Sequence, residues 1–229
     1  MVIDVGGTTT DVGQLKLGFP REANSVVKVG GVRTLFRMPD LLSIGLGGGS
    51  HVVLDPLSIG PVSVGYRLLT DGIAFGGAQL TTTDVAVAAG ILDLGDKAKV
   101  AHLDAATCAK VFSEAARLAE EAVDRMKTEA GDVPLIAVGG GAFLIPEKMA
   151  GVSQVIHVEH GDCANAVGAA IAQVSGECDQ IFKDMSRGEA LAEAQRGALA
   201  LRRGVPVVPG MDRARGAREM CDGIRGSDQ

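Results

Sequence analysis

Two acidic residues, Asp4 and Asp11, bracket a run of glycine and threonine near the start of the chain. Gly6-Gly7 permits positive φ and lets a ligand approach the backbone closely. Successive backbone N–H groups and the hydroxyls of Thr8–Thr10 can donate to an anion, while the two carboxylates can hold Mg²⁺ directly or through water. The segment therefore predicts a β-hairpin whose turn binds phosphate. An ordinary glycine turn is the alternative, whereas a P-loop is excluded because no lysine follows the glycines.

Two further glycine runs, Gly47–Gly49 and Gly139–Gly141, each follow an apolar stretch. Ligands of α/β proteins bind in crevices at the carboxyl ends of strands. Three such turns therefore suggest that several strand ends converge on one anionic ligand. The third turn precedes a predicted short helix, whose N-terminus adds partial positive charge, and its flat backbone suits a nucleobase and ribose. Close packing of strand against helix is the alternative for any single turn.

The composition limits the classes of function. The chain has 229 residues, 46% of them hydrophobic and 22% charged, so it can bury a substantial core in one large or two small domains. A net charge of −6, the absence of tryptophan and a single tyrosine, Tyr66, argue against a nucleic-acid partner. No apolar run predicts a membrane span, and the start lacks the features of a signal peptide. Four cysteines without a Cys-x-x-Cys pair indicate reduced thiols and a cytoplasmic protein.

Hydrophobic periodicity predicts a mixed α/β domain that begins with a β-hairpin over residues 1–18. The clearest helix is expected over 104–130, capped by Asp104 and ended by Gly131. The stretch 60–83 is expected to be a long glycine-containing loop, followed by a helix over 84–92 with Thr83 as its N-cap. The remaining expected strands are 26–29, 32–36, 41–46, 51–54, 133–138 and 155–158, and the remaining expected helices are 145–150, 162–174 and 186–201. Small residues predict close packing of the 162–174 helix, and the domain is expected to span 1–204 before a poorly ordered tail, 205–229.

Taken together, the hairpin and the third glycine turn resemble the second phosphate motif and the adenosine motif of the actin-like ATPase superfamily. More narrowly, the chain resembles the C-terminal ATPase region of the A-type subunit of the hydantoinase/oxoprolinase family. The matching stretches are Asp4–Asp11, Ser43–Ser50, Ile59–Gly65, Phe75–Asp84, Val138–Ala142 and Asn165–Ala170, in family order. The resemblance implies an actin-like ATPase (ribonuclease H-like) fold, with a mixed sheet that begins with a β-hairpin and is flanked by helices.

The resemblance also implies the activity of an ATP-dependent amidohydrolase of the 5-oxoprolinase and hydantoinase type. Such an enzyme phosphorylates the amide oxygen of a hydantoin, lactam or 5-oxoproline ring so that water can open the ring. A ring amide is a poor electrophile, and an O-phosphorylated intermediate carries a far better leaving group, which a water-excluding cleft protects. Phosphoryl transfer requires mainly positioning and charge neutralisation. ATP and Mg²⁺ are the implied cofactors, and the implied partners are a cyclic amide, a B-type subunit and further copies of the chain in a homo-oligomer.

Carried over residue by residue, the resemblance assigns the β- and γ-phosphates to the first turn and adenosine to the third. The phosphate set is Gly6, Gly7, Thr8, Thr9 and Thr10, and the adenosine set is Gly139, Gly140, Gly141 and Ala142. Asp4 or Asp11 would hold Mg²⁺ or orient the nucleophile. Gly47–Ser50 and Thr81–Asp84 would lie near the cleft and the acceptor, with turn or N-cap chemistry as the equal alternative. His51 is either a general acid or a structural residue.

The chain also departs from the family pattern. Family members carry an earlier domain with a first phosphate motif, and this chain begins at the second, so a preceding domain is expected to be missing. The stretch 66–75 lacks the proline-rich continuation of the longer oxoprolinases, which leaves the substrate open. Three interpretations therefore stand. The first is a ring-opening enzyme, the second a small-molecule kinase or ATP-dependent carboxylase subunit of the same superfamily, and the third a non-catalytic module that binds a partner subunit.

Overall fold

The computed structural model describes residues 1–23, 27–29, 31–34, 38–171, 178 and 180–203. Two compact units divide the chain, Met1–Asn165 and Ala166–Gln229. The first unit contains the main β-sheet and the three glycine turns. The second contains helix α5 (Arg187–Arg203), which forms where the 186–201 helix was expected. The expected domain end at residue 204 and the tail that follows it lie outside the described residues.

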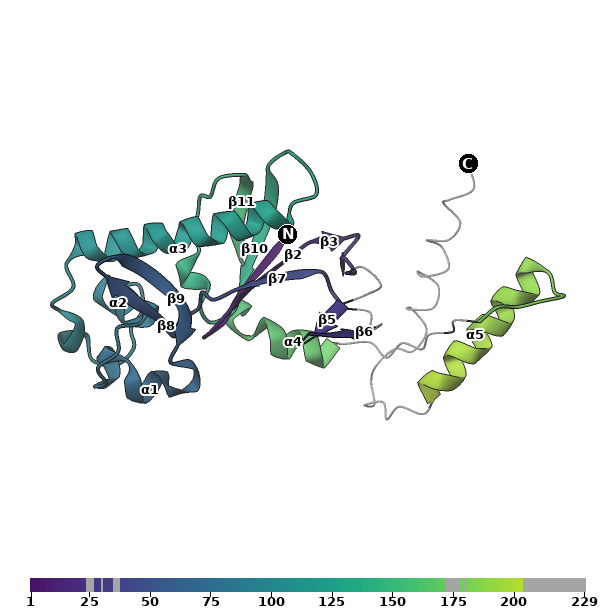
Figure 1. Cartoon of the computed structure of the whole chain (residues 1–229), viewed down its shortest axis with the longest axis horizontal. Helices are drawn as coiled ribbons and strands as arrows, with labels where there is room; N and C mark the ends of the chain where they lie inside the picture. The colour runs from purple at the N-terminus through teal and green to yellow at the C-terminus, as the bar shows by residue number, and fades with distance from the viewer. Residues whose placement is uncertain (24–26, 30, 35–37, 172–177, 179, 204–229) are drawn as a thin grey trace. The chain divides into compact units, whose positions relative to one another are not determined.

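The main sheet has five strands in the order β11-β10-β1-β2-β7 (Figure 1). Its strands are β1 (Val2–Val5), β2 (Thr10–Gly13), β7 (Leu41–Ile44), β10 (Val133–Val138) and β11 (Val152–His157). β2 pairs antiparallel with both β1 and β7, whereas β10 pairs parallel with both β1 and β11. β7 therefore runs in the same direction as β1. The expected mixed sheet that opens with a hairpin is confirmed.

Smaller elements complete the described chain. Three two-stranded sheets pair β3 (Leu15–Lys16) with β4 (Phe19–Pro20), β5 (Val27–Val29) with β6 (Val32–Thr34), and β8 (Ser50–Leu54) with β9 (Leu57–Ser63). The short helices are α1 (Leu68–Asp71), α2 (Thr82–Ala88) and α4 (Ala164–Ile171), and the 3-10 turns are η1 (Gly65–Arg67), η2 (Ile73–Phe75), η3 (Lys97–Val100), η4 (Ala142–Leu144) and η5 (Gly161–Cys163). Within the described ranges, no helix has the length and apolar character needed to cross a membrane.

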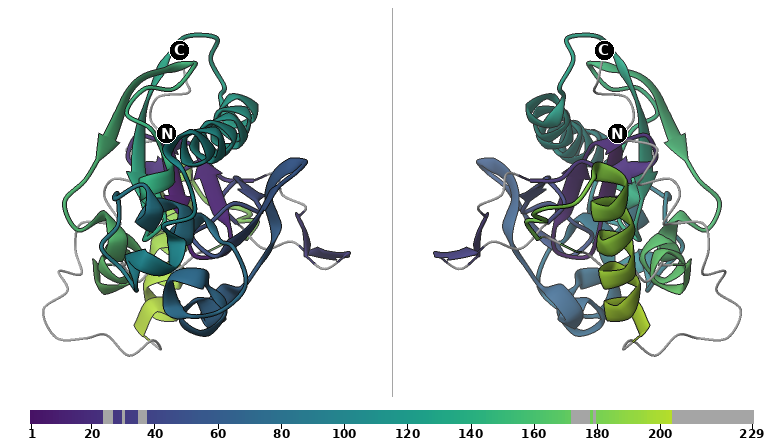
Figure 2. Two further views of the ribbon diagram at one scale, coloured as in Figure 1. Left: turned by 90° about the vertical axis from the view of Figure 1, so that its left-hand side faces the viewer. Right: turned by 90° about the vertical axis from the view of Figure 1, so that its right-hand side faces the viewer.

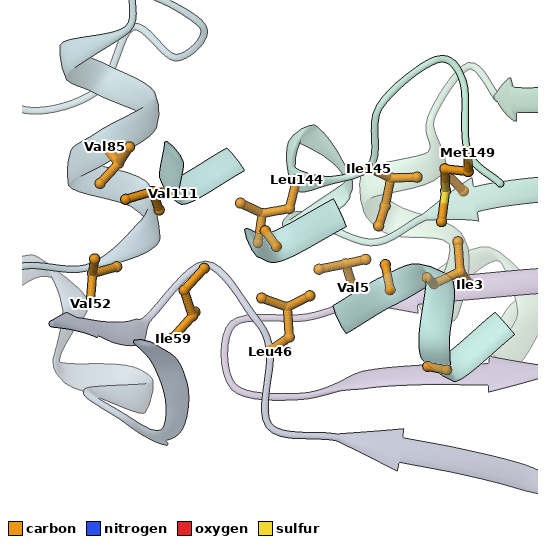
Figure 3. Close-up of a cluster of buried hydrophobic side chains, with 14 of the residues drawn as sticks. Ile3, Val5, Leu46, Val52, Ile59, Val85, Val111, Leu144, Ile145 and Met149 are labelled. Carbon is orange, nitrogen blue, oxygen red and sulfur yellow. The ribbon is translucent and has the colours of Figure 1, made fainter. Parts of the chain in front are cut away.

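The two faces of the first hairpin have opposite characters, because side chains alternate along a strand. Ile3 and Val5 are fully buried on one face, whereas Asp4 and Asp11 lie on the other. Figure 3 shows Ile3 and Val5 within the apolar cluster, with Leu46 beside Val5. The core therefore fixes the hairpin from one side and leaves its acidic side available for other contacts.

The long helix α3 (Ala105–Met126) packs against the sheet over β2 and β7 (Figures 1 and 2). Its buried residues recur at helical spacing, and they are Cys108, Val111, Ala115, Ala119, Ala122, Val123 and Met126. Leu118, which has the same helical spacing, is only half-buried. The helix ends at Met126 and not at Gly131, since Lys127 already has an extended backbone with ψ of 139°.

Asp104 caps α3 as predicted. Its carboxylate accepts a hydrogen bond from the backbone N–H of Thr107 at 2.6 Å, and this bond lowers the pKa of Asp104 below its ordinary value. Because the pKa is lower in the folded state, the bond stabilises the protein at pH values above the ordinary aspartate pKa of about 4, and this stabilisation is lost as the pH falls through the folded-state pKa.

Asp104→Asn keeps a capping oxygen that cannot titrate. When the thermal midpoint is measured as a function of pH, we expect Asp104→Asn to make its decline below pH ~4 less steep. An unchanged slope in this acid range would contradict the capping role of the Asp104 carboxylate.

Two expectations around the middle of the chain are wrong. The stretch 60–83 is not one long loop, because the end of β9 and the short elements η1, α1 and η2 occupy it. Gly60 and Pro61 lie inside β9, and both residue types are unusual in strand interiors, which concealed the strand. Helix α2 begins earlier than expected, with Thr81 and not Thr83 as its N-cap. The reason is a capping box, in which the side chains of Thr81 and Asp84 each accept from the other's backbone N–H.

Other differences lie after β10. The helix expected over 145–150 is absent, and only the turn η4 precedes it. Ile145 stands before a proline and is extended, with φ of −94° and ψ of 117°, as steric contact with a proline ring favours. The strand expected at 155–158 begins earlier, at Val152. The helix expected over 162–174 appears as η5 and α4, with 172–174 outside the described residues, and α4 buries none of its residues, so the predicted close packing is not found there.

Candidate functional site

The three glycine turns follow three strands that run in the same direction. Gly6-Gly7 follows β1, Gly47–Gly49 follows β7, and Gly139–Gly141 follows β10. Because these strands are parallel members of one sheet, all three turns lie at the same edge of that sheet. This is the edge at which ligands of α/β proteins bind. The turns therefore converge, as the sequence predicts.

Hydrogen bonds join the three turns directly. The backbone N–H groups of Gly48 and Gly49 donate to the carbonyl oxygens of Gly6, at 3.0 Å, and Gly7, at 2.7 Å. On the other side, the N–H of Gly141 donates to the carbonyl oxygen of Val5 at 2.7 Å. The first turn is thus held between the other two.

Glycine serves two different purposes in these turns. A Cβ on Gly47, Gly139 or Gly141 would lie 2.7, 2.3 or 2.7 Å, respectively, from an atom of the first hairpin. Close packing, the alternative given for a single turn, therefore requires glycine at these positions. A Cβ on Gly7 or Gly140 would meet nothing within 4 Å. Those two residues present bare backbone to open space, where a ligand could approach.

The first turn carries backbone donors without partners. The N–H of Gly6 donates to the carbonyl oxygen of Thr9 at 2.8 Å and closes the turn. Among the described residues, the N–H groups of Gly7, Thr8 and Thr9 donate to no other group, and all three residues are exposed. Successive free N–H groups in a turn form a concavity that binds anions. The geometry therefore suits phosphate oxygens at this turn.

Thr10 is placed differently from its two neighbours. It is fully buried, and its hydroxyl donates to the carbonyl oxygen of Leu46 at 2.7 Å. This hydroxyl braces the segment that leads into the second turn. Thr8 and Thr9 are therefore the threonines of the first turn whose hydroxyls lie on the exposed side.

Two carboxylates and two neutral donors form a row across the sheet. Asp4 on β1 stands directly opposite Asp11 on β2, so their side chains share one face. Asp11 is in turn opposite Ser43 on β7, and the Ser43 hydroxyl donates to Oδ1 of Asp11. Nδ2 of Asn165, in the first turn of α4, donates to Oδ2 of Asp4 at 3.0 Å. We refer to Asn165, Asp4, Asp11 and Ser43 as the carboxylate row.

The donor set of the carboxylate row fits Mg²⁺. Like charges directly opposite on neighbouring strands repel, and a bound divalent cation would relieve that repulsion. Within the part of the chain that the structure describes, no group of three or more His, Cys, Asp or Glu side chains could hold a metal ion. Mg²⁺ at phosphate sites needs only one or two carboxylates, because waters and phosphate oxygens supply its other ligands. The assignment of Mg²⁺ to Asp4 and Asp11 stays a prediction that this chemistry favours.

The segment Thr81–Asp84 positions the second turn. All four of its residues are buried, and the segment caps α2. The Thr82 hydroxyl lies 2.6 Å from the carbonyl oxygen of Gly47 and 2.8 Å from that of Gly48. The Thr83 hydroxyl donates to Gly48 at 2.8 Å. The N-cap alternative given for this segment is thus what the structure shows.

Sequence reasoning assigned no role to three polar residues at this edge. The Ser63 hydroxyl donates to the carbonyl oxygen of Gly7 at 3.3 Å. Ser43 and Asn165 lie 32 and 161 positions from the aspartates that they contact, so no local spacing could link them. The sequence indicated a role for these residues only in that they lie inside the stretches that resemble the family. His51 is half-buried and forms a β-bridge with Thr81, and its role as a general acid stays a prediction.

These features define the class of protein. A mixed sheet that opens with a hairpin, with glycine turns at the ends of its parallel strands beside paired carboxylates, is the actin-like ATPase (ribonuclease H-like) fold of the solved structures that the chain resembles. Residues 1–177 match the family described as Hydantoinase/oxoprolinase. The chain therefore belongs to the hydantoinase/oxoprolinase family.

Two solved structures illustrate the shared fold. One is the nucleotide-free structure of acetone carboxylase, from a study of ATP-dependent acetone carboxylation, at 20% identity and a TM-score of 0.63 over 88% of this chain and 35% of that chain. Another is the ATP-dependent caprolactamase from Pseudomonas jessenii, at 20% identity and a TM-score of 0.53 over 85% of this chain and 34% of that chain. This chain spans about a third of the length of either structure. No curated protein matches the chain.

Proposed function

We propose that this chain is the nucleotide-binding half of an ATP-dependent amidohydrolase of the hydantoinase/5-oxoprolinase type, which phosphorylates a cyclic amide for ring opening. The observation that carries the proposal is the convergence of the three turns beside the carboxylate row. Free N–H groups, bare glycine backbone and two carboxylates meet at one sheet edge. Anion donors and hard oxygen ligands in one place suit a magnesium nucleotide.

Each part of the site has a separate task in this proposal. The N–H groups and hydroxyls of Gly7–Thr9 bind the β- and γ-phosphates, where developing charge needs donors fixed in advance. Gly139–Ala142 lies against adenosine, with Gly140 as the point of closest approach. Asp4 and Asp11 hold Mg²⁺, which supplies charge neutralisation on the phosphates when it is bound. The buried face of the hairpin keeps these groups rigid.

The proposed reaction makes a ring amide a better electrophile. ATP supplies the γ-phosphoryl group: the bond between Pγ and its bridging oxygen breaks, a bond from the amide oxygen to phosphorus forms, and ADP leaves. Water then adds to the activated carbon, and the ring C–N bond breaks to leave an amine and an acyl phosphate. A second water hydrolyses the acyl phosphate to a carboxylate and inorganic phosphate. The backbone donors of Gly7–Thr9 position the transferred group throughout the first step. Attack of water is assigned to a site shared with a B-type partner subunit, on the family resemblance.

A second candidate function is an ATP-dependent carboxylase subunit that activates a ketone in the same way. The structural likeness to acetone carboxylase favours it, whereas the likeness to caprolactamase favours ring opening. Both likenesses stand at 20% identity, so the family match is the reason that the cyclic amide is placed first. ATP hydrolysis measured with hydantoin, 5-oxoproline, caprolactam and acetone in turn, with the partner subunit present, separates the two. If only acetone with bicarbonate, and none of the three cyclic amides, stimulated ATP hydrolysis, the second candidate function would replace the first.

Valine at Gly7 or at Gly140 is expected to weaken binding of a non-hydrolysable ATP analogue at least about tenfold, or about 1.4 kcal/mol. Neither glycine has a positive φ, and a side chain at either position would meet no protein atom within 4 Å. Both variants should therefore fold normally and block only the approach of a ligand. Titration calorimetry with the purified protein and MgATP analogue measures the effect.

Gly131 provides the matched control, because it also lacks a positive φ and also faces open space, but lies beyond the end of α3. Gly131→Val should bind the analogue as the parent protein does. Equal affinity in all three variants and the parent would remove the nucleotide assignment of both turns, as would the absence of any binding by the parent protein.

A further inference from the structure

Both aspartates of the carboxylate row are held by uncharged side chains. Asn165 donates its amide N–H to Asp4, and Ser43 donates its hydroxyl to Asp11. No lysine or arginine of the described residues forms an ion pair with either aspartate. The pair is therefore oriented by hydrogen bonds without having its charge neutralised by the protein.

The orientation of Asp4 depends on one hydrogen bond and on the space that a glycine leaves. Oδ2 accepts a hydrogen bond from Asn165, and Oδ1 occupies space that is open because Gly139 has no side chain, since a Cβ there would lie 2.5 Å from it. Asn165 is brought there by the turn before α4, because the N–H of Gly139 donates to the carbonyl oxygen of Gly161 at 2.8 Å. The third glycine turn and the start of α4 thus place one amide on one carboxylate oxygen.

The orientation of Asp11 is fixed by the edge strand β7. Ser43 and Asp11 are direct cross-strand partners, and Ser43 is exposed, so its hydroxyl has no packing role in the core. The hydroxyl donates its hydrogen bond to Oδ1 of Asp11, and Oδ2 of Asp11 has no partner among the described residues. Each aspartate therefore has one oxygen tied by a neutral donor, and the row keeps two formal negative charges.

We propose that Asn165 and Ser43 are positioning residues that hold the Asp4 and Asp11 carboxylates ready for a divalent cation. This inference rests on the proposed function, because it concerns the Mg²⁺ that would accompany the nucleotide. A neutral donor fixes a carboxylate without competing with the cation for its charge, whereas a lysine or arginine would. Outer partners that orient metal ligands commonly change metal affinity or activity by about 10- to 100-fold when they are removed.

Mn²⁺ alone, without nucleotide, is the probe that tests the inference. Its binding to the purified protein is followed by electron paramagnetic resonance, which measures free Mn²⁺, and far-ultraviolet circular dichroism records the thermal midpoint of each variant. We expect Ser43→Ala and Asn165→Leu to weaken Mn²⁺ binding about tenfold at an unchanged midpoint. Leucine keeps the approximate size of asparagine but has no donor. Ser43→Thr restores the hydroxyl on an exposed strand position and should bind Mn²⁺ within about twofold of the parent protein. Asp4→Asn, which removes one of the two proposed cation ligands, is the more drastic variant.

Ser153 on β11 is the matched control, since it is an exposed strand serine outside the carboxylate row. Ser153→Ala should leave Mn²⁺ affinity unchanged. The inference is overturned if the parent protein binds no Mn²⁺, if Ser43→Ala and Asn165→Leu bind as the parent does, or if Ser43→Thr binds as weakly as Ser43→Ala. Mn²⁺ binding as expected with no binding of an ATP analogue would remove the proposed function alone. Analogue binding with unaltered Mn²⁺ affinity in both variants would remove this inference alone.

Discussion

Replacing Asp84 with alanine is expected to lower the free energy of unfolding by about 3 kcal/mol, a large part of the total stability of an ordinary domain. The Asp84 carboxylate is fully buried and accepts from the backbone N–H of Ala74 at 2.7 Å. It also accepts from the N–H and the hydroxyl of Thr81, each at 2.8 Å. Alanine would leave these three donors buried without an acceptor, and each such group costs about 1–3 kcal/mol. Chemical denaturation followed by circular dichroism measures the loss.

Asp93→Ala is the control for this prediction, because Asp93 is exposed and an exposed change away from such features usually alters stability by less than about 0.5 kcal/mol. The loss at Asp84 should also loosen the second glycine turn, since Thr82 and Thr83 of the same segment hold it. Similar stabilities of the two variants would mean that the capping box does not organise this region.

Asp11→Asn is expected to reduce ATP-dependent turnover by about 100-fold or more while leaving the thermal midpoint unchanged. Asparagine has the shape of aspartate, and its oxygen can still accept from the Ser43 hydroxyl. The substitution therefore removes a charge from the carboxylate row and little else. Steady-state kinetics of the complete enzyme, with substrate and partner subunit present, gives the ratio of kcat values.

Asp124→Asn is the control, because Asp124 is exposed on α3 and does not belong to the carboxylate row. The substitution removes one negative charge, as Asp11→Asn does, and should keep full turnover. A near-normal kcat for Asp11→Asn would defeat the assignment of Asp11. A lower thermal midpoint together with a lower kcat would instead indicate that the Asp11 charge contributes to the stability of the fold.

Local patterns were enough to predict the hairpin and α3. Two glycines between apolar stretches identify the hairpin, and a strong N-cap with helical spacing identifies the start of α3 at Asp104. The convergence of the three glycine turns also followed, because parallel strands share one edge for their carboxyl ends. These features depend on short stretches of sequence or on one topological rule.

What the sequence could not provide depends on distant or competing contacts. Three threonines in a row offered three competing caps for α2, and the spacing of Thr81 and Asp84 in the capping box identifies Thr81 as the one used. The buried position of Thr10 depends on Leu46, which follows β7. The amide of Asn165 reaches Asp4 across 161 positions. No short window of the sequence contains the pairs formed by Thr10 with Leu46 and by Asn165 with Asp4.

The contrast between crowded and open glycines has a consequence for engineering. A saturation library scored for soluble yield should reject every substitution at Gly139 and Gly141, where even a methyl group would collide with the hairpin. The same library should accept many residues at Gly7 and Gly140. Scored for catalysis, those two permissive sites should become intolerant, so that the difference between the two screens would outline the ligand on the protein surface.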